Sequence, residues 1–184
     1  FGLINLAETF DTSEVIMGVP VIGCLSSIRD LYKSGHRNIA MGIGDNFKRE
    51  EIFFELKKIG FNFPNLCHPV TSIDPSSIIG EGNVIGPNVA LGAEVVIGDN
   101  NIINTGAVIE HQSIIGSHNH LSVSATICGN VKIGDKVFAG ANSTIIDKIS
   151  VSDKTTLGAG STLISSTDRP GLTLVGCPAK VTNK

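Results

Sequence analysis

The 184-residue sequence contains no run of basic residues, no C-x-x-C pair and no long apolar segment. The formal net charge is −3 and the isoelectric point is near 5.9, so we expect no nucleic-acid surface. Four widely separated cysteines disfavour a zinc knuckle or a redox pair and are typical of the reducing cytoplasm, where we expect the protein. No apolar run approaches the ~20 residues of a membrane helix, so we expect no membrane span.

From Ile73 onward an aliphatic residue recurs at every sixth position, which we call the aliphatic slot. The sixteen slots are Ile73, Ile79, Ile85, Leu91, Ile97, Ile103, Ile109, Ile115, Leu121, Ile127, Ile133, Ala139, Ile145, Val151, Leu157 and Leu163. The residue four places after a slot is nearly always small or β-branched, and the residue directly after it is glycine in half of the cases. This period predicts a parallel β-helix, in which three hexads form one triangular coil.

Each hexad is expected to form one short strand and one corner. Strand alternation points the slot and the residue four places later inward, and we expect the glycine after the slot to supply the unusual φ/ψ of the corner. A β-sandwich is the alternative, but its turns are not spaced so evenly. We expect about five stacked coils. The period does not set their handedness, and crossovers in proteins are generally right-handed.

Residues 1–68 follow a different pattern. FGLI, VPVIG and NIAMGIG resemble strands, whereas SSIRDLYKSG and DNFKREEIFFELKKIG resemble helices. The second helix has Asp45 or Asn46 as its N-cap and Gly60 as its stop. We therefore predict a small α/β domain with a parallel sheet over residues 1–68 and a β-helix over residues 69–184. Because the chain opens at Phe1 inside a strand-like segment, we expect that upstream residues are missing and that the first domain is incomplete.

Three histidines, His111, His118 and His120, fall within ten residues of the repeat. None occupies an inward position, so we expect all three at a corner or on an outer face rather than as satisfied core histidines. The corner glycine is lost around them, for example at Asn104 and Cys128. Such departures from a local rule occur most often at functional sites. Plain solvent exposure is the alternative interpretation.

Gly129 follows His111 by eighteen residues and should therefore lie beside it on the next coil. A glycine leaves the backbone open to a ligand, and its N–H would be free to donate. A base beside an exposed backbone donor is the layout that acyl transfer requires. The same count places Phe138 beside His120.

The histidines could instead form a metal site, as in the gamma-class carbonic anhydrases, which are also hexapeptide β-helices. Those enzymes combine a lone histidine with a pair about five residues apart on a later coil. Here the spacings are seven and two, across adjacent faces of one coil, and no nearby pattern completes a tetrahedral set. We therefore expect no metal.

Several segments resemble the bacterial sugar acyltransferases that join a small Rossmann-like domain to a left-handed β-helix. They are GVPVIG, GIGDN, FPNLCHP, NTGAVIEHQSIIGSHNHLSVSATICGNVKIGDKVFAGANSTI and VGCPAK. The family includes the UDP-amino-sugar N-acetyltransferase of the bacillosamine pathway and the sialic-acid O-acetyltransferases. The resemblance implies acetyl-CoA as co-substrate and a homotrimer with active sites between subunits.

The resemblance also implies roles for individual residues. His111 would be the general base. The next residue is often a glutamate that raises the basicity of the histidine, and here it is the neutral amide of Gln112. His120 would contact the acetyl donor. Backbone contacts to the donor would come from Gly129, Ala141 and Ala159.

In the family the N-terminal domain holds a nucleotide-sugar. Its first strand and glycine-rich turn would precede Phe1, and Asn5 stands where relatives carry acidic residues. Gly44 and Asn46 of GIGDN lie at an expected strand-to-helix turn whose N–H groups could meet a phosphate, although an ordinary tight turn is the alternative. Asn104 is a further candidate substrate contact.

Together these features predict acetyl transfer from acetyl-CoA to the amino group of a nucleotide-linked amino-deoxy sugar for bacterial surface glycans. The acceptor would attack the thioester directly. O-acetylation of sialic acid or a related sugar is the alternative. A non-catalytic β-helix, such as an ice-binding protein, is disfavoured because the threonines are scattered and because an α/β domain would be unnecessary.

Overall fold

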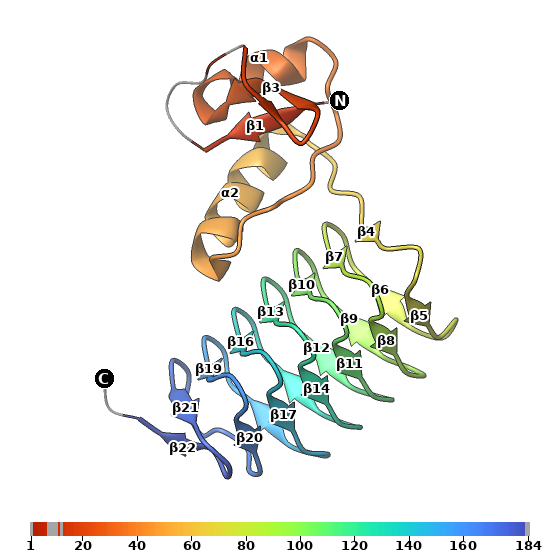
Figure 1. Cartoon of the computed structure of the whole chain (residues 1–184), viewed down its shortest axis with the longest axis vertical. Coiled ribbons are helices and arrows are strands. Elements are labelled where there is room, and N and C mark those ends of the chain that lie inside the picture. Colours follow the sequence, from red (N-terminus) through yellow and green to blue (C-terminus); the bar gives the residue numbers. More distant parts are fainter. Residues whose placement is uncertain (1, 7–10, 12, 183–184) are drawn as a thin grey trace. The chain divides into compact units, whose positions relative to one another are not determined.

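The computed structural model describes residues 2–6, 11 and 13–182 (Figure 1). The chain divides into two compact units, residues 1–39 with 55–62 and residues 40–54 with 63–184. The division differs from the predicted boundary at residue 68, because residues 40–54 and 63–68 belong to the larger unit. In the described ranges no helix has the length and apolar character needed to cross a membrane.

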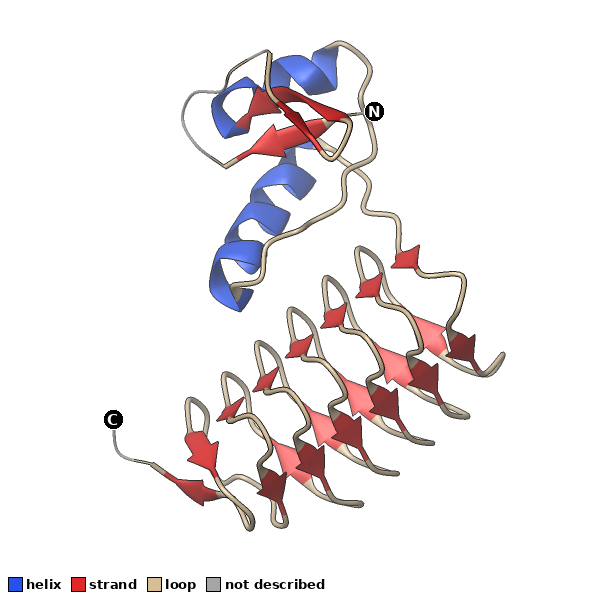
Figure 2. Cartoon of the chain, viewed as in Figure 1, coloured by secondary structure: helices blue, strands red, loops and turns tan. Residues whose placement is uncertain are grey.

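The smaller unit contains a mixed three-stranded sheet in the order β1-β3-β2 (Figure 2). Its elements are β1 (Leu3–Asn5), β2 (Val15–Ile16), β3 (Val19–Cys24), the 3-10 helix η1 (Leu25–Ser27) and α1 (Ile28–Lys33). Strand β1 runs parallel to β3, as predicted, but β2 is antiparallel to it. The expectation of a purely parallel sheet is wrong here because Met17 and Gly18, both at positive φ, form a tight hairpin turn.

Helix α2 (Asn46–Ile59) forms where the sequence predicts it. The Asp45 carboxylate accepts a hydrogen bond from the Lys48 N–H at 2.8 Å, as an N-cap does, and Gly60 follows the helix at a φ of +110°. Ile52, Phe53 and Leu56 on one face of α2 are buried.

The strand predicted for NIAMGIG is wrong. In the described part of the chain this segment has only an isolated bridge, between Asn38 and Asn62. The carbonyls of Ile43 and Gly44 accept hydrogen bonds from the Arg49 guanidinium instead of from a neighbouring strand. A backbone whose acceptors are satisfied by a side chain has no need of a sheet partner.

The larger unit is a parallel β-helix, as predicted, with three sheets. The eight-stranded sheet contains β4 (Leu66–Cys67), β7 (Val84–Ile85), β10 (Ile102–Ile103), β13 (His120–Leu121), β16 (Phe138–Ala139), β19 (Thr156–Leu157), β21 (Thr173–Val175) and β22 (Lys180–Val181). The six-stranded sheet contains β5 (Ser72–Ile73), β8 (Ala90–Leu91), β11 (Val108–Ile109), β14 (Thr126–Ile127), β17 (Thr144–Ile145) and β20 (Thr162–Leu163). The five-stranded sheet contains β6 (Ile78–Ile79), β9 (Val96–Ile97), β12 (Ile114–Ile115), β15 (Lys132–Ile133) and β18 (Ser150–Val151).

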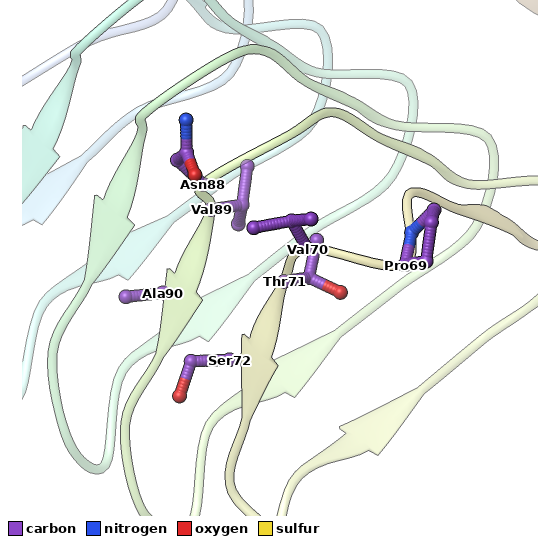
Figure 3. A pocket seen from close by; sticks show the side chains of 7 residues that line it. All are labelled: Pro69, Val70, Thr71, Ser72, Asn88, Val89 and Ala90. Carbon is purple, nitrogen blue, oxygen red and sulfur yellow. The ribbon is translucent and has the colours of Figure 1, made fainter.

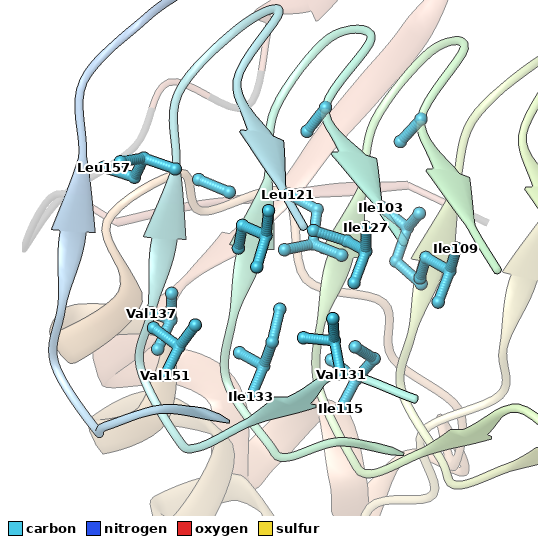
Figure 4. Close-up of a cluster of buried hydrophobic side chains, with 14 of the residues drawn as sticks. Ile103, Ile109, Ile115, Leu121, Ile127, Val131, Ile133, Val137, Val151 and Leu157 are labelled. Atoms are coloured by element: carbon cyan, nitrogen blue, oxygen red, sulfur yellow. The ribbon is translucent and has the colours of Figure 1, made fainter. Parts of the chain in front are cut away.

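Consecutive coils pair in a register of eighteen residues, for example Ile109 with Ile127 and Leu121 with Ala139. The slot residues fill the interior of the coil stack (Figure 4). Every slot from Ile85 to Leu163 is buried, and Ile73 and Ile79 at the first coil are partly buried. The hexad count therefore predicted this core correctly.

The three corners have distinct surroundings, and we name them after their main feature. The His111 corner, after the six-stranded sheet, comprises residues 92–95, 110–113, 128–131 and 146–149. The α2 corner, after the five-stranded sheet, comprises residues 80–83, 98–101, 116–119 and 134–137. The Ala141 corner, after the eight-stranded sheet, comprises residues 86–89, 104–107, 122–125, 140–143 and 158–161.

The left-handed residue of a corner is the third after the slot, and the sequence-based explanation of the corner glycine is wrong. Asn100, Gln112 and His118 have φ near +60°, whereas Gly98, directly after its slot, does not have a positive φ. A Cβ on Gly98 would lie 2.6 Å from the Ser117 hydroxyl oxygen on the next coil. The glycine is required for close approach between coils rather than for an unusual φ.

A ladder of buried asparagines runs along the α2 corner. The Asn83 side-chain oxygen accepts from the Asn101 N–H at 2.9 Å, and the Asn101 oxygen accepts from the Asn119 N–H at 2.7 Å. The Asn119 oxygen then accepts from the Val137 N–H at 2.6 Å. The side chains thus satisfy buried backbone donors where the chain turns.

Asn101→Ala should lower the free energy of unfolding by about 1–3 kcal/mol, because the buried Asn119 N–H loses its acceptor. Ser143→Ala is the matched control, since Ser143 occupies the same hexad position but its buried hydroxyl has no partner among the described residues. Urea unfolding of both variants measures the difference. Equal destabilisation by the two substitutions would contradict a stabilising ladder.

Candidate functional site

The His111 side chain stands exposed at its corner, with its ring against Gly129 of the next coil. The Asn130 N–H donates to the His111 carbonyl at 2.9 Å, which fixes the two coils in register. A Cβ on Gly129 would lie 2.7 Å from Nε2 and 2.8 Å from Cε1 of the ring. No acceptor for the Gly129 N–H is found among the described residues. An imidazole and a backbone N–H are therefore neighbours, at the place where the eighteen-residue count predicts them.

Gln112 is directed to the preceding coil. Its side-chain amide donates to the Glu94 carboxylate at 3.0 Å, and both side chains are exposed. A carboxylate is thus present at the His111 corner, one coil before Gln112. Sequence reasoning missed Glu94, although subtracting eighteen from 112 gives its number.

His118 is a satisfied structural histidine, contrary to expectation. Its side chain lies at a corner but is only 4% exposed, and its Nδ1 lies 2.8 Å from the Asn100 amide nitrogen. The ring packs against Phe53 and Phe54, with centroid distances of 5.6 and 5.4 Å. The hexad count describes only the coil and could not show that α2 residues cover this corner.

His120 lies on the outer face of β13 and packs edge-to-face on Phe138, the neighbour predicted for it, at a centroid distance of 5.2 Å. Neither ring nitrogen has a partner among the described residues, and both are inaccessible to solvent. Burial lowers the pKa of His120, and the Gly44 backbone beside the ring offsets part of this decrease. The His120 ring is therefore buried beside the Gly44 backbone and makes no well-formed hydrogen bond within the described residues.

Ala141, Ala159 and Asn104 share the Ala141 corner, so a single chain does not bring them to His111. The Ala141 carbonyl accepts from the Gly160 N–H at 2.8 Å, and the Asn104 side chain accepts from the Thr105 N–H at 2.8 Å. At the first coils of this corner, the side chains shown in Figure 3 line a shallow hollow. They are Pro69, Val70, Thr71, Ser72, Asn88, Val89 and Ala90.

The candidate substrate residues of the N-terminal region lie in different units. Asn5 ends β1 in the smaller unit and pairs with Cys24. Gly44 is exposed in the larger unit. The Asn46 side chain is buried there, donates to the Val137 carbonyl at 3.1 Å and accepts from Arg49 at 2.8 Å. The Asn46 amide is therefore occupied by the protein itself, and only its backbone can serve a ligand.

Arg49 is the structural centre of the α2 corner, and sequence reasoning missed it. Its side chain is 1% exposed. Its guanidinium donates to the carbonyls of Asn100 at 3.1 Å, His118 at 2.8 Å and Asn119 at 3.0 Å. Burial lowers the pKa of Arg49 to about 10, so the group is still charged at neutral pH. The sequence did indicate that Arg49 is buried, because it occupies the same face of α2 as Ile52, Phe53 and Leu56.

The described residues contain no group of three or more His, Cys, Asp or Glu side chains arranged to hold a metal ion. Within these residues His111, His118 and His120 are therefore not grouped as metal ligands.

Residues 76–111 match the family model for the bacterial transferase hexapeptide (six repeats). No curated protein matches the chain. Among solved structures, PerB from Caulobacter crescentus, in complex with CoA and GDP-perosamine, is 31% identical, with a TM-score of 0.88. The match covers 91% of this chain and 81% of PerB. The chain belongs to the hexapeptide-repeat sugar N-acyltransferases of the left-handed β-helix type.

Two further solved structures are similar to this acyltransferase. The acetyltransferase domain of PglB from Neisseria gonorrhoeae is 28% identical, with a TM-score of 0.90, and the match covers 98% of this chain and 87% of that domain. WeeI from Acinetobacter baumannii is 23% identical, with a TM-score of 0.89, over 99% of this chain and 85% of WeeI. The likeness to WeeI supports the fold alone.

His118 should make stability depend on pH. Burial lowers the pKa of His118 in the folded acyltransferase, so below the unfolded value of ~6.5 the unfolded chain binds more protons. Stability should therefore fall as the pH falls below that value. Thermal unfolding between pH 5.5 and 7.5 should show a smaller pH dependence for His118→Asn, a residue that already occupies the equivalent position at Asn100. Parallel curves for the two proteins would refute the assignment.

Proposed function

We propose that this chain transfers an acetyl group from acetyl-CoA to the amino group of a nucleotide-linked amino sugar. The observation that carries the proposal is the His111 imidazole beside the unpaired Gly129 N–H. Similar structures support the substrates, since PerB was solved with CoA and GDP-perosamine, and the PglB domain with acetyl coenzyme A. His111, Gln112 and Gly129 are the proposed catalytic residues.

In the proposed reaction the His111 imidazole accepts a proton from the amine as the amine nitrogen attacks the thioester carbonyl carbon. A C–N bond forms, the C–S bond breaks, and CoA leaves as the thiolate. The Gly129 N–H donates to the carbonyl oxygen as negative charge develops on it. His111 then releases its proton to the thiolate or to water, so no covalent enzyme intermediate is required.

We propose a homotrimer with active sites between subunits, and the separation of the corners supports sites shared between chains. His111 and Gly129 lie at one corner, whereas Ala141 and Ala159, the proposed donor contacts, lie at another. A site that uses both sets takes one corner from each of two chains. Exposed Ile78 and Ile114 on the five-stranded sheet, 65% and 45% exposed, offer apolar surface for such an assembly.

We further propose that the N-terminal unit is part of a Rossmann-like domain for the nucleotide-sugar. The parallel pair β1 and β3 supports this assignment. Asn5 in the smaller unit, and Gly44, the Asn46 backbone and Asn104 in the larger unit, are the proposed acceptor contacts, and His120 is a proposed donor contact. A cytoplasmic location is consistent with four cysteines that are all free.

The test is CoA release from acetyl-CoA with GDP-, UDP- and dTDP-linked 4-amino sugars as acceptors. Wild type should release CoA with at least one of them, and His111→Ala should be slower by about 10²–10⁴-fold through loss of the base. Because the His111 side chain is exposed, the thermal midpoint of His111→Ala should equal that of wild type. Free sialic acid is the O-acetylation control. Turnover with sialic acid alone, or full activity of His111→Ala, would overturn the proposal.

Gly129→Ala should reduce kcat/KM by about 10²-fold, because the new methyl group displaces the His111 ring. The φ of Gly129 is not positive, so alanine adds this contact without backbone strain. Steady-state rates, with the thermal midpoint as a check on folding, measure the effect. Wild-type kcat/KM in a folded Gly129→Ala protein would show that the His111 ring does not act as the base from its position against Gly129.

A further inference from the structure

Arg49 joins two parts of the larger unit. On one side its guanidinium binds the corner carbonyls of Asn100, His118 and Asn119 at 2.8–3.1 Å. On the other side, Nη1 donates to the carbonyl of Ile43 at 2.9 Å and to that of Gly44 at 3.4 Å. The turn before α2 is therefore attached to the coils by one buried side chain.

The turn that Arg49 holds lies against His120. The Gly44 backbone lies close enough to the His120 ring to raise its pKa, and neither solvent-inaccessible ring nitrogen makes a well-formed hydrogen bond within the described residues. Buried polar atoms without a partner are rare in proteins, and they frequently mark a place where a ligand or water supplies the missing hydrogen bond. Gly44 itself is exposed and has open space beside its Cα.

We propose that Arg49 is a positioning residue for the acceptor: it fixes the Ile43–Gly44 turn beside His120 so that the nucleotide-sugar meets a preformed backbone surface. This inference rests on the function proposed above. Arginine suits the task because its planar fork reaches several carbonyls at once, whereas lysine offers a single ammonium group. Fixing the turn before binding lowers the entropic cost of ordering it with the substrate.

A second contact of α2 with the same corner provides a control. The Lys136 ammonium donates to the Glu50 carboxylate at 2.5 Å, and this pair is partly buried. Glu50→Ala loosens α2 from the coils but removes no contact with Ile43 or Gly44. A merely structural role for Arg49 predicts that Arg49→Lys and Glu50→Ala behave alike.

The experiment measures kcat and both KM values with acetyl-CoA and whichever of the GDP-, UDP- and dTDP-linked 4-amino sugars wild type acetylates fastest. Arg49→Lys should raise the KM for the sugar about 10-fold, with kcat and the KM for acetyl-CoA within about 3-fold of wild type. Glu50→Ala should lower the thermal midpoint and leave the sugar KM unchanged. Hydrogen exchange of residues 42–46 should be faster in Arg49→Lys only.

An unchanged sugar KM in Arg49→Lys, or equal changes in both variants, would overturn the inference. If Arg49→Lys does not fold, Arg49→Gln is measured in its place. If neither variant folds, Arg49 serves folding alone and the inference is wrong. Inactivity of wild type with all three sugars would instead refute the proposed function. The hydrogen-exchange comparison still decides, in that case, whether Arg49 holds the turn.

Discussion

The eighteen-residue register between coils is the constraint on which the rest of the structure depends. Because each strand from β4 to β20 pairs with the strand one coil away, its residues have a fixed neighbour eighteen positions earlier or later. The register stacks the aliphatic slots into one core and aligns the asparagine ladder. It also places Gly129 under the His111 ring and Glu94 beside Gln112. Core, corner and candidate site thus follow from one repeating backbone pattern.

The three corners of the coil have different surroundings. At the α2 corner, Arg49 and the phenylalanines of α2 cover the turns and bury His118. At the His111 corner the base stays exposed, beside a glycine that leaves room for its ring. A buried histidine, His118, and an exposed one, His111, therefore occupy neighbouring corners of the same repeat. What distinguishes them is whether residues from outside the repeat pack over the corner.

Local periodicity made the β-helix, its slots and the pairing of His111 with Gly129 predictable from the sequence. The burial of His118 was not predictable in this way, because it depends on α2, some seventy residues earlier in the chain. The corner glycine was located correctly but explained wrongly: its role lies in the contact between coils, which a single hexad does not contain. The strand expected at NIAMGIG failed for a related reason, since Arg49 takes up the carbonyls of Ile43 and Gly44.

The close approach of the coils also limits how such a protein can change in length. A one-residue insertion within a strand would turn slot side chains toward the solvent and move every later residue off its neighbour. Gain or loss of a complete coil leaves all other pairings as they were. Sequence divergence in this family should therefore conserve spacing more strictly than residue identity along the coils. Duplicated or deleted segments should come in multiples of eighteen residues, with the pair of coils that carries His111 and Gly129 kept intact.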